Sequence, residues 1–368
     1  MHTLAYRKCI EPMTPYIPGK PIEDVQRELG LTNVVKLASN ENTLGCSPKA
    51  KDAVIACLND SNYYPDGNCT RLREHLAGSL GIAPGEIVFG CGADEVIAMT
   101  GKVFVNPGDE CITAAQTFSQ YAASTVSMGG TMVYAPMKDN SYDLDAIFEC
   151  ITDKTKVIFL ANPNNPTGTM FSAEEQSAFL DKVPPHVFVL VDEAYAEYVS
   201  DPSYPQTLPL LKKYKNIMLV KTFSKIYGLA SYRVGYGIAN EETIKMFERI
   251  RPPFNVTVQG QAAALAAYQD TDFVRNSFED NRKAVEYYCN ELDCMGIAYI
   301  PSQANFVATD TGRDGREVFQ ALMRKGYIVR PTYIFGMGIS WIRVTMGTLE
   351  QMKGFVNALK EVLKEIRP

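Results

Sequence analysis

The chain has 368 residues, 46% hydrophobic and 21% charged, which is the composition of a folded globular protein with a large core. Its formal net charge of −6 argues against nucleic acid or an anionic membrane as a partner and favours a small-molecule substrate. Nine cysteines without a C-x-x-C pair and only three histidines predict neither a disulfide framework nor a metal site. We therefore expect no metal, no membrane span, no targeting leader and a cytoplasmic location.

The N-terminal segment, residues 1–38, is rich in proline and turn residues and contains one short helical pattern, PIEDVQRELG. Such a segment has little apolar surface for a core of its own. We expect it to form an arm that packs on a smaller domain or on a partner subunit.

The middle of the chain, residues 39–250, alternates short apolar runs with helix-like segments. Seven runs predict strands: EIVFG, ECITA, TMVYAP, KVIFLAN, VFVLVDEAY, NIMLVKT and VGYGIAN. Most are continuously apolar, which is typical of strands that are covered on both faces. The sequence therefore predicts an α/β domain with a mainly parallel seven-stranded sheet between helices, and a ligand beyond the carboxyl ends of the strands.

After residue 250 the pattern changes to long helical segments followed by the shorter strands ANFVAT, GYIVRP and WIRVTMG. We expect residues 251–368 to form a smaller α+β domain. The last helix carries an apolar stripe at 3.6-residue spacing, which we interpret as core packing.

Two polar residues follow strands of the predicted sheet. Asp192 comes directly after VFVLV, and a carboxylate in such apolar surroundings requires a cation or a strong donor nearby, although a helix cap or a structural ion pair is the alternative. Asn165 lies in ANPNNPTGT after KVIFL, where a simple turn is the alternative.

The segment KTFSKIYGLASYRVGY holds two lysines with different surroundings. Lys221 lies within the predicted strand and is interpreted as an ordinary strand lysine. Lys225 lies past the strand end, close to Thr222 and Ser224, and Arg233 begins the next strand-like run. Together these residues describe an anion clamp beside a lysine.

Upstream, GCGADE places Ala93 and Asp94 in the first turn of a helix, where free N–H groups attract phosphate; ordinary capping is the alternative. Phe118 follows ECITA and would present an aromatic face there, or pack in the core. Five strand ends thus supply a phosphate cradle, an aromatic face, an asparagine, an aspartate and a lysine beside an arginine. Pyridoxal phosphate needs all five, so the sequence predicts this cofactor.

With these residues located, the chain resembles the fold-type I pyridoxal-phosphate enzymes of the aspartate aminotransferase superfamily, and within it the histidinol-phosphate aminotransferase family. The resemblance runs through nearly the whole chain and is carried by KLASNENTLGCSP, YYPDGNCTRLREHLA, GCGADE, ANPNNPTGT, VDEAYAEYV, KTFSKIYGLASYRVGY, RPPFNV and WIRVTMGT. It implies an aspartate-aminotransferase-like fold.

The resemblance also implies roles for individual residues. Lys225 would hold the cofactor as a Schiff base and move a proton between substrate and cofactor, and Asp192 would pair with the pyridinium nitrogen. Asn165 and Tyr195 would hydrogen-bond the phenolic oxygen, and Phe118 would stack on the ring. The residues implied to hold the phosphate are Ala93, Asp94, Thr222, Ser224, Arg233 and, from the other subunit of a homodimer, Tyr64. Those implied for the substrate are Tyr16, Asn40, Arg330 and Arg343.

The reaction implied by the resemblance is amino transfer between histidinol phosphate and 2-oxoglutarate, a step of histidine biosynthesis. Thr43 stands where the family usually has proline, and Ser231 and Tyr232 stand where it usually has Gly-Leu. These departures leave alternatives open: an aminotransferase for phenylalanine or tyrosine, a threonine-phosphate decarboxylase, or a cofactor-binding regulatory protein without catalysis.

Overall fold

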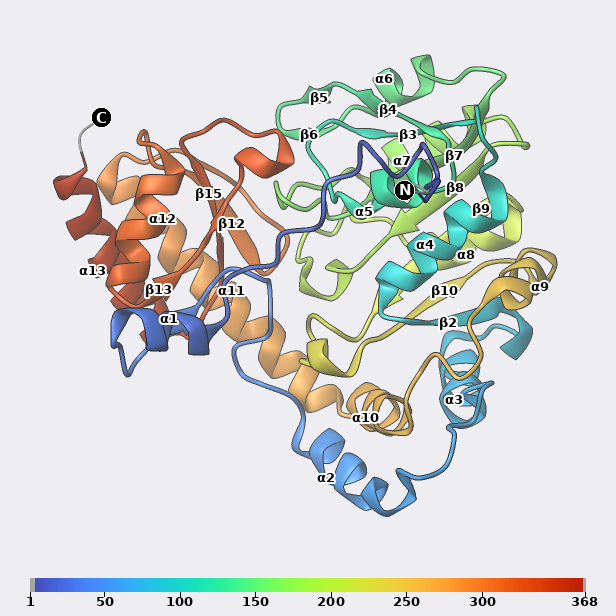
Figure 1. Cartoon of the computed structure of the whole chain (residues 1–368), viewed down its shortest axis with the longest axis horizontal. Coiled ribbons are helices and arrows are strands. Elements are labelled where there is room, and N and C mark those ends of the chain that lie inside the picture. The colour runs from blue at the N-terminus through green and yellow to red at the C-terminus, as the bar shows by residue number, and fades with distance from the viewer. Residues whose placement is uncertain (1–3, 367–368) are drawn as a thin grey trace.

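The fold is described from a computed structural model of residues 4–366; the first three residues of the predicted arm and the last two of the predicted small domain lie outside the described residues. Figure 1 shows a large domain mainly in light blue to gold, beside a smaller domain mainly in orange and red against which the dark blue helix α1 (Ile22–Leu29) lies. No helix in the described part of the chain is long and apolar enough to cross a membrane.

The large domain is built on a seven-stranded sheet. In spatial order the strands are β2 (Ile87–Cys91), β10 (Val234–Ile238), β9 (Ile217–Thr222), β8 (Phe188–Asp192), β7 (Thr155–Ala161), β3 (Glu110–Ala114) and β4 (Thr131–Ala135). β10 runs antiparallel to both of its neighbours, and the other pairs are parallel. All seven predicted strands and the mainly parallel sheet are confirmed.

Helices cover both faces of this sheet, which explains why its strands lack alternation: every residue of β8 is buried. The helices are α4 (Ala93–Phe104), α5 (Gln120–Val126), α6 (Leu144–Glu149), α7 (Ala173–Lys182), α8 (Thr207–Lys213) and α9 (Glu241–Ile250), and a small hairpin is formed by β5 (Met137–Lys138) and β6 (Ser141–Tyr142). The carboxyl ends of the parallel strands therefore open toward a single edge, where a ligand can reach them.

The helices that follow the predicted domain boundary at residue 250 also pack on the large core. Helix α10 (Val258–Tyr268) packs on α2 (Pro48–Ala56) and α3 (Thr70–Leu80), and its buried alanines belong to the large core. The following helix, α11 (Thr271–Met295), begins against the large core with Val274 and Phe278 and continues into the small core with Tyr288 and Leu292. We propose that the domains divide within α11, which Figure 1 shows running from one to the other.

The small domain is the predicted α+β unit. Its four-stranded sheet has the order β11 (Tyr299–Ile300), β12 (Phe306–Asp310), β15 (Trp341–Thr345) and β14 (Arg330–Pro331), covered by α12 (Gly315–Arg324) and α13 (Leu349–Glu365). The apolar stripe of α13 is buried in this core. Part of the predicted arm packs here too, because α1 (Ile22–Leu29) buries Val25 against Ile328, and β1 (Val35–Lys36) pairs with β13 (Tyr327–Ile328).

Helices α4 and α5 approach each other closely at Gly101. The Ser124 hydroxyl donates to the Ile97 carbonyl at 2.7 Å and accepts from the Gly101 N–H at 3.1 Å. A Cβ added at Gly101 would lie 2.4 Å from the Ser124 carbonyl oxygen, which is shorter than any tolerable contact. A glycine is therefore required for α5 to sit where it does.

Gly101→Ala is expected to lower the free energy of unfolding by about 1–3 kcal/mol, because the added methyl group must push α5 away from α4. The matched control is Gly78→Ala in α3, where a Cβ meets nothing within 4 Å and the helix gains about 0.5–1 kcal/mol. Urea-unfolding midpoints measured by fluorescence compare the two. Equal midpoints for both variants would show that the close approach is not real.

Candidate active site

A cavity of about 190 Å³ opens at the carboxyl ends of the large sheet and is lined by both domains and by the arm. It brings together every predicted site residue except Tyr64, namely Tyr16, Asn40, Ala93, Asp94, Phe118, Asn165, Asp192, Tyr195, Thr222, Ser224, Lys225, Arg233, Arg330 and Arg343. These residues come from segments more than 300 positions apart in the chain, so the fold alone assembles them.

Asp192, the last residue of β8, forms the floor of the cavity and is 6% exposed. Its Oδ2 accepts a hydrogen bond from the Tyr121 hydroxyl at 2.8 Å, and its Oδ1 accepts one from the Ala194 N–H at 3.0 Å. Burial raises the pKa of this carboxyl to about 6, although both hydrogen bonds and the charge of Lys225 act in the opposite direction. We expected either a cation or a strong hydrogen-bond donor beside Asp192. The structure places a donor there, the neutral phenol of Tyr121.

Lys225 lies three residues beyond the end of β9, in a turn that Thr222 stabilises by accepting the Ser224 N–H at 3.0 Å. Its Nζ lies 5.5 Å from the centre of the Tyr195 ring, and its one side-chain hydrogen bond within residues 4–366, to the Ser39 carbonyl, is long at 3.4 Å. The amine is thus exposed to the cavity and loosely held, which leaves it free to react.

Lys221 points to the opposite side of the sheet, because successive side chains of a strand alternate between its faces. Its Nζ lies 3.0 Å from the Glu197 carboxylate and 3.4 Å from that of Glu193, and all three side chains are largely buried. Lys221, which we interpreted as an ordinary strand lysine, therefore belongs to a structural ion-pair network. It does not line the cavity that contains Lys225.

The end of the cavity that was predicted to hold a phosphate combines a cation with a helix N-terminus. Arg233 lies 3.3 Å from the Ser224 hydroxyl and 3.0 Å from the Asp94 carboxylate. No side chain of the described residues caps α4 at Gly92, so its first-turn N–H groups, including those of Ala93 and Asp94, have no partner within the helix. A Cβ at Gly92 would lie 2.2 Å from the Arg233 guanidinium, so glycine is what lets the cation reach the helix end. An anion is favoured here.

A second cationic region lies on the small-domain side. Arg343 on β15 is buried, donates to the Ala38 carbonyl at 2.7 Å and to the Asn165 side chain, and keeps an Nε–H without a partner among the described residues. Burial lowers the pKa of its guanidinium to about 10. Arg330 donates to the Ile17 carbonyl of the arm at 2.6 Å.

The arm closes over these arginines. The Arg330 guanidinium lies 5.9 Å from the centre of the Tyr16 ring and 5.8 Å from that of Phe335, so aromatic faces flank the charge. Since both arginines also touch backbone carbonyls of residues 17 and 38, the arm and the small domain form one wall of the cavity.

Asn40 joins this wall to the floor. Its Nδ2 donates to the Tyr195 hydroxyl at 2.9 Å, and its Oδ1 accepts from the Thr345 hydroxyl at 3.0 Å. The side chain is 1% exposed, and these two partners belong to the two domains that meet at the cavity. Asn40 therefore fixes the Tyr195 hydroxyl relative to β15.

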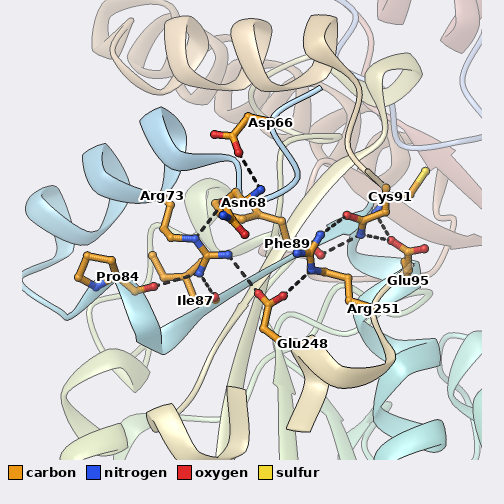
Figure 2. A network of polar contacts seen from close by, with 11 residues as sticks. Asp66, Asn68, Arg73, Pro84, Ile87, Phe89, Cys91, Glu95, Glu248 and Arg251 are labelled. Atoms are coloured by element: carbon orange, nitrogen blue, oxygen red, sulfur yellow. Dashed lines mark hydrogen bonds and ion pairs between the residues drawn. The ribbon is translucent and has the colours of Figure 1, made fainter. Parts of the chain in front are cut away.

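Tyr64 lies outside the cavity and is 81% exposed, with its ring stacked on Phe254 at 4.7 Å between centres. Figure 2 shows a polar network that includes Arg251, close to Phe254 in the chain, and Glu95 in the first turn of α4. Arg251 donates to Asn255 at 2.8 Å, and Asn255 donates to Glu95 in the first turn of α4 at 2.6 Å. The exposed aromatic pair is thus held in a fixed position relative to the phosphate end of the cavity.

The other half of this network anchors the loop after Tyr64. Arg73 on α3 donates to the Asn68 carbonyl at 2.9 Å and to Glu248 at 3.1 Å, and Arg251 donates to the same Glu248 carboxylate at 2.7 Å (Figure 2). Both arginine side chains are mostly buried, so solvent and salt screen these contacts less than they screen surface ion pairs.

Sequence reasoning missed Tyr121, which is in direct contact with Asp192. It lies three residues after Phe118 in the first turn of α5, and only the packing of α5 on the sheet brings its hydroxyl to β8. Thr345 was missed for the same reason, because its partner Asn40 lies 305 positions away. Phe335 lies only five residues after Arg330, and no sequence pattern marks the packing of its ring beside that guanidinium.

The lining residues fit pyridoxal phosphate. The donor set contains a free amine, a buried carboxyl, hydroxyl and amide donors beside an aromatic ring, and a cradle at Gly92 that a Cβ would fill. The amine follows the end of β9, the acid ends the neighbouring strand β8, and the anion site lies at the N-terminus of α4, so all three groups open on one cavity.

Comparisons with known proteins agree with this fit. The aminotransferase class I and II family matches residues 32–359. The histidinol-phosphate aminotransferase of Caldicellulosiruptor saccharolyticus is 46% identical over 97% of this chain and 100% of its own. Among solved structures, the histidinol-phosphate aminotransferase of Sinorhizobium meliloti in complex with pyridoxal-5'-phosphate superposes with a TM-score of 0.90 at 28% identity, covering 98% of each chain. A mutant aspartate aminotransferase of Thermus thermophilus shares the fold, with a TM-score of 0.83 at 21% identity over 98% of this chain and 100% of its own.

Proposed function

This chain belongs to the class I and II aminotransferase family, and on that premise we propose that it transfers an amino group reversibly between histidinol phosphate and 2-oxoglutarate. It is an enzyme, a transaminase that uses pyridoxal phosphate. The observation that carries the substrate proposal is the pair of buried arginines, Arg330 and Arg343, that face the cavity from the small domain, opposite the anion site at α4.

When bound, pyridoxal phosphate supplies a ring that accepts the electron pair left on the substrate carbon after its proton is removed. Arg233, Thr222, Ser224 and the first-turn N–H groups of α4 would hold its phosphate. The remaining contacts would be Phe118 against the ring, Asn165 and Tyr195 at the phenolic oxygen, and Asp192 at the ring nitrogen.

Lys225 would serve twice, first as the covalent attachment point and then as the base. Its Nζ would take the proton from the amine-bearing carbon of the substrate and deliver it to the cofactor carbon to which Lys225 had been attached. The loose hold on this amine suits both roles, because its single long contact to the Ser39 carbonyl costs little to break. Asn40 fixes the Tyr195 hydroxyl, and the Tyr195 ring lies beside the Lys225 amine, so Tyr195 would present its hydroxyl to the cofactor in a fixed position next to that amine.

The two substrates place anionic groups differently: histidinol phosphate has a phosphate and no carboxylate, and glutamate has two carboxylates. Arg343 can accept an anion at its free Nε–H without losing a hydrogen bond that it already makes. Arg330 is flanked by Tyr16 and Phe335, whose faces can pack against an imidazole while the guanidinium binds a phosphate. This arrangement supports a site that takes both molecules in turn.

The test is to compare kcat/KM for histidinol phosphate, phenylalanine, tyrosine and threonine phosphate with 2-oxoglutarate as acceptor. We expect histidinol phosphate to lead by about a hundredfold or more, because a rival that lacks the phosphate leaves a buried arginine unpaired. A preference for phenylalanine or tyrosine would refute the substrate and leave the transaminase intact. Release of carbon dioxide from threonine phosphate without keto-acid formation would identify a lyase.

We also propose that the working unit is a cytoplasmic homodimer. Tyr64 and Phe254 are exposed and line a surface groove of about 590 Å³ with Tyr63 and Pro253, a concentration of apolar side chains that a second copy would cover. Nine free cysteines suit a reducing compartment. In the dimer, Tyr64 would contact the cofactor phosphate of the partner.

Tyr64→Phe is expected to weaken cofactor binding by about tenfold, since one hydrogen bond to a charged phosphate is lost. Mixing Tyr64→Ala with Lys225→Ala subunits gives the decisive control, because a mixed dimer contains one complete site. At a cofactor concentration too low to load Tyr64→Ala, activity that is low in each variant and rises on mixing would support the contact across the interface. Mixed dimers that form and stay inactive would refute it.

A further inference from the structure

The hydroxyl of Tyr121 is the closest polar neighbour of Asp192. It donates to Oδ2 of Asp192 at 2.8 Å, and the opposite oxygen, Oδ1, accepts the Ala194 N–H at 3.0 Å. Tyr121 is 0% exposed, so water cannot replace its hydroxyl from the surface. A carboxylate held at both oxygens cannot rotate, and its remaining lone pairs keep a fixed direction.

Two aromatic contacts and the packing of its helix fix the Tyr121 ring. It is stacked on Phe159 of β7, with 5.1 Å between centres and an angle of 11° between planes, and it meets the edge of Phe118 at 5.8 Å and 86°. Its helix, α5, is held on α4 by the close contact between Ser124 and Gly101. The position of the hydroxyl is therefore determined by the core, and so is that of the Phe118 ring.

We propose that Tyr121 is a positioning residue, which holds Asp192 as an oriented carboxylate for the cofactor's ring nitrogen and fixes Phe118 as the stacking face. The proposal rests on the proposed function of the cavity, where both Asp192 and Phe118 contact the cofactor. Tyr121 itself has no role in proton transfer here: it acts through these two neighbours.

The charge on Asp192 depends on the groups that surround it. Burial raises the pKa of the carboxyl to about 6, and the Tyr121 hydrogen bond is the strongest influence that lowers it. The Ala194 N–H and Lys225 also lower this pKa, and Asp94 on α4 raises it. The charge of Asp192 helps to raise the pKa of Tyr142 on β6 and of Tyr204 before α8, whose hydroxyls are hydrogen-bonded to other groups. Among these neighbours Tyr121 is the one that donates a side-chain hydrogen bond, because the pKa of its own phenol is raised well above the usual value by burial and it stays neutral.

The alternative is that Tyr121 has only a structural role as a packed core residue, like Tyr288 in the small domain. Tyr288 is equally buried and shares a hydrogen bond with the Thr309 hydroxyl at 3.0 Å. Tyr121→Phe and Tyr288→Phe therefore remove the same atom from two similar sites, and only the first touches Asp192. A structural role predicts loss of stability in both and no change in the titration of Asp192 in either.

The experiment follows the Asp192 carboxyl by ¹³C NMR in the apoprotein, and the affinity for pyridoxal phosphate by fluorescence between pH 6 and pH 9. In Tyr121→Phe we expect the Asp192 midpoint to rise by about one to two pH units, and the affinity at pH 7 to fall by about tenfold to a hundredfold. The loss in affinity should narrow toward pH 9, where the carboxyl of the variant is ionised again. Tyr288→Phe should match the wild type in both measurements.

A second variant is expected to shift the pKa of Asp192 in the opposite direction. Replacing Tyr121 alone with 3-fluorotyrosine makes the phenol a stronger donor, so the Asp192 midpoint should move downward while the packing is kept. An unchanged midpoint in both variants, or an affinity loss that is constant from pH 6 to pH 9, would overturn the positioning role. Because the titration uses the apoprotein, it can fail while the aminotransferase activity stands, and the two failures are distinguishable.

Discussion

Lys225→Ala is expected to lower kcat by about 10⁴-fold or more and to abolish the yellow colour of the purified protein, because one amine supplies both covalent attachment and proton transfer. Within the described part of the chain this amine has no structural role of its own, since its one hydrogen bond is 3.4 Å long and it faces the cavity. The unfolding midpoint of the apoprotein should therefore stay close to that of the wild type.

The matched control is Lys221→Met, four residues earlier in the chain. Lys221 separates two buried carboxylates, Glu193 and Glu197, so its removal should cost about 3–5 kcal/mol of stability. The colour and the catalytic rate of the folded variant should remain. Lys225→Ala is thus expected to lose activity and keep its stability, and Lys221→Met to lose stability and keep its activity. A colourless Lys221→Met beside a yellow Lys225→Ala would reverse our assignment.

Asp192→Asn is expected to lower kcat by about a thousandfold, because the ring nitrogen loses the negative charge that keeps it protonated. The same change should stabilise the apoprotein. In the variant the amide Nδ2 can donate to the Tyr121 oxygen, and Oδ1 still accepts the Ala194 N–H, so no buried group loses its partner. Activity and stability would then move in opposite directions, as in other sites built for function.

The pH dependence of this gain follows from the pKa of Asp192. Burial raises it from 3.8 to about 6 in the folded protein, so the folded state binds the proton more tightly than the unfolded state. The contribution of Asp192 to stability is therefore present below pH 4 and is lost as the pH rises through about 6. Above pH 6 the asparagine variant should exceed the wild type by up to roughly 3 kcal/mol, and near pH 4 the two should coincide.

Unfolding midpoints of both apoproteins at pH 4, 6 and 8 measure this difference. Tyr288→Phe serves as a control without a carboxyl, and its difference from the wild type should be constant with pH. A difference between Asp192→Asn and wild type that does not change from pH 4 to pH 8 would mean that Asp192 carries no elevated pKa.

Much of the fold could be predicted because it follows from local patterns. The continuous apolar runs at β7, β8 and β9 indicate directly that both faces of these strands are buried. The polar residues that follow them indicate the edge of the sheet where the cavity opens. The clustering of Asp192, Lys225 and Arg233 follows from topology, because neighbouring strands bring their ends together.

Other features depend on contacts that no local pattern contains. Tyr121 reaches Asp192 across 71 positions of sequence, and Asn40 reaches Thr345 across 305. The alanine-rich α10 falls in the predicted second domain, because its small side chains do not indicate which core they join. In the structure it packs on α2 and α3. The partners of Lys221 are likewise set by strand alternation and by the turn after β8.

The most direct test is to reduce the cofactor-loaded protein with borohydride, digest it and locate the modified lysine by mass spectrometry. We predict that the added mass of the reduced cofactor lies on the peptide that contains Lys225, and that Lys221 in the same region is unmodified. Modification of Lys221, or of a lysine outside the cavity, with Lys225 left free, would contradict the assignment of the active site.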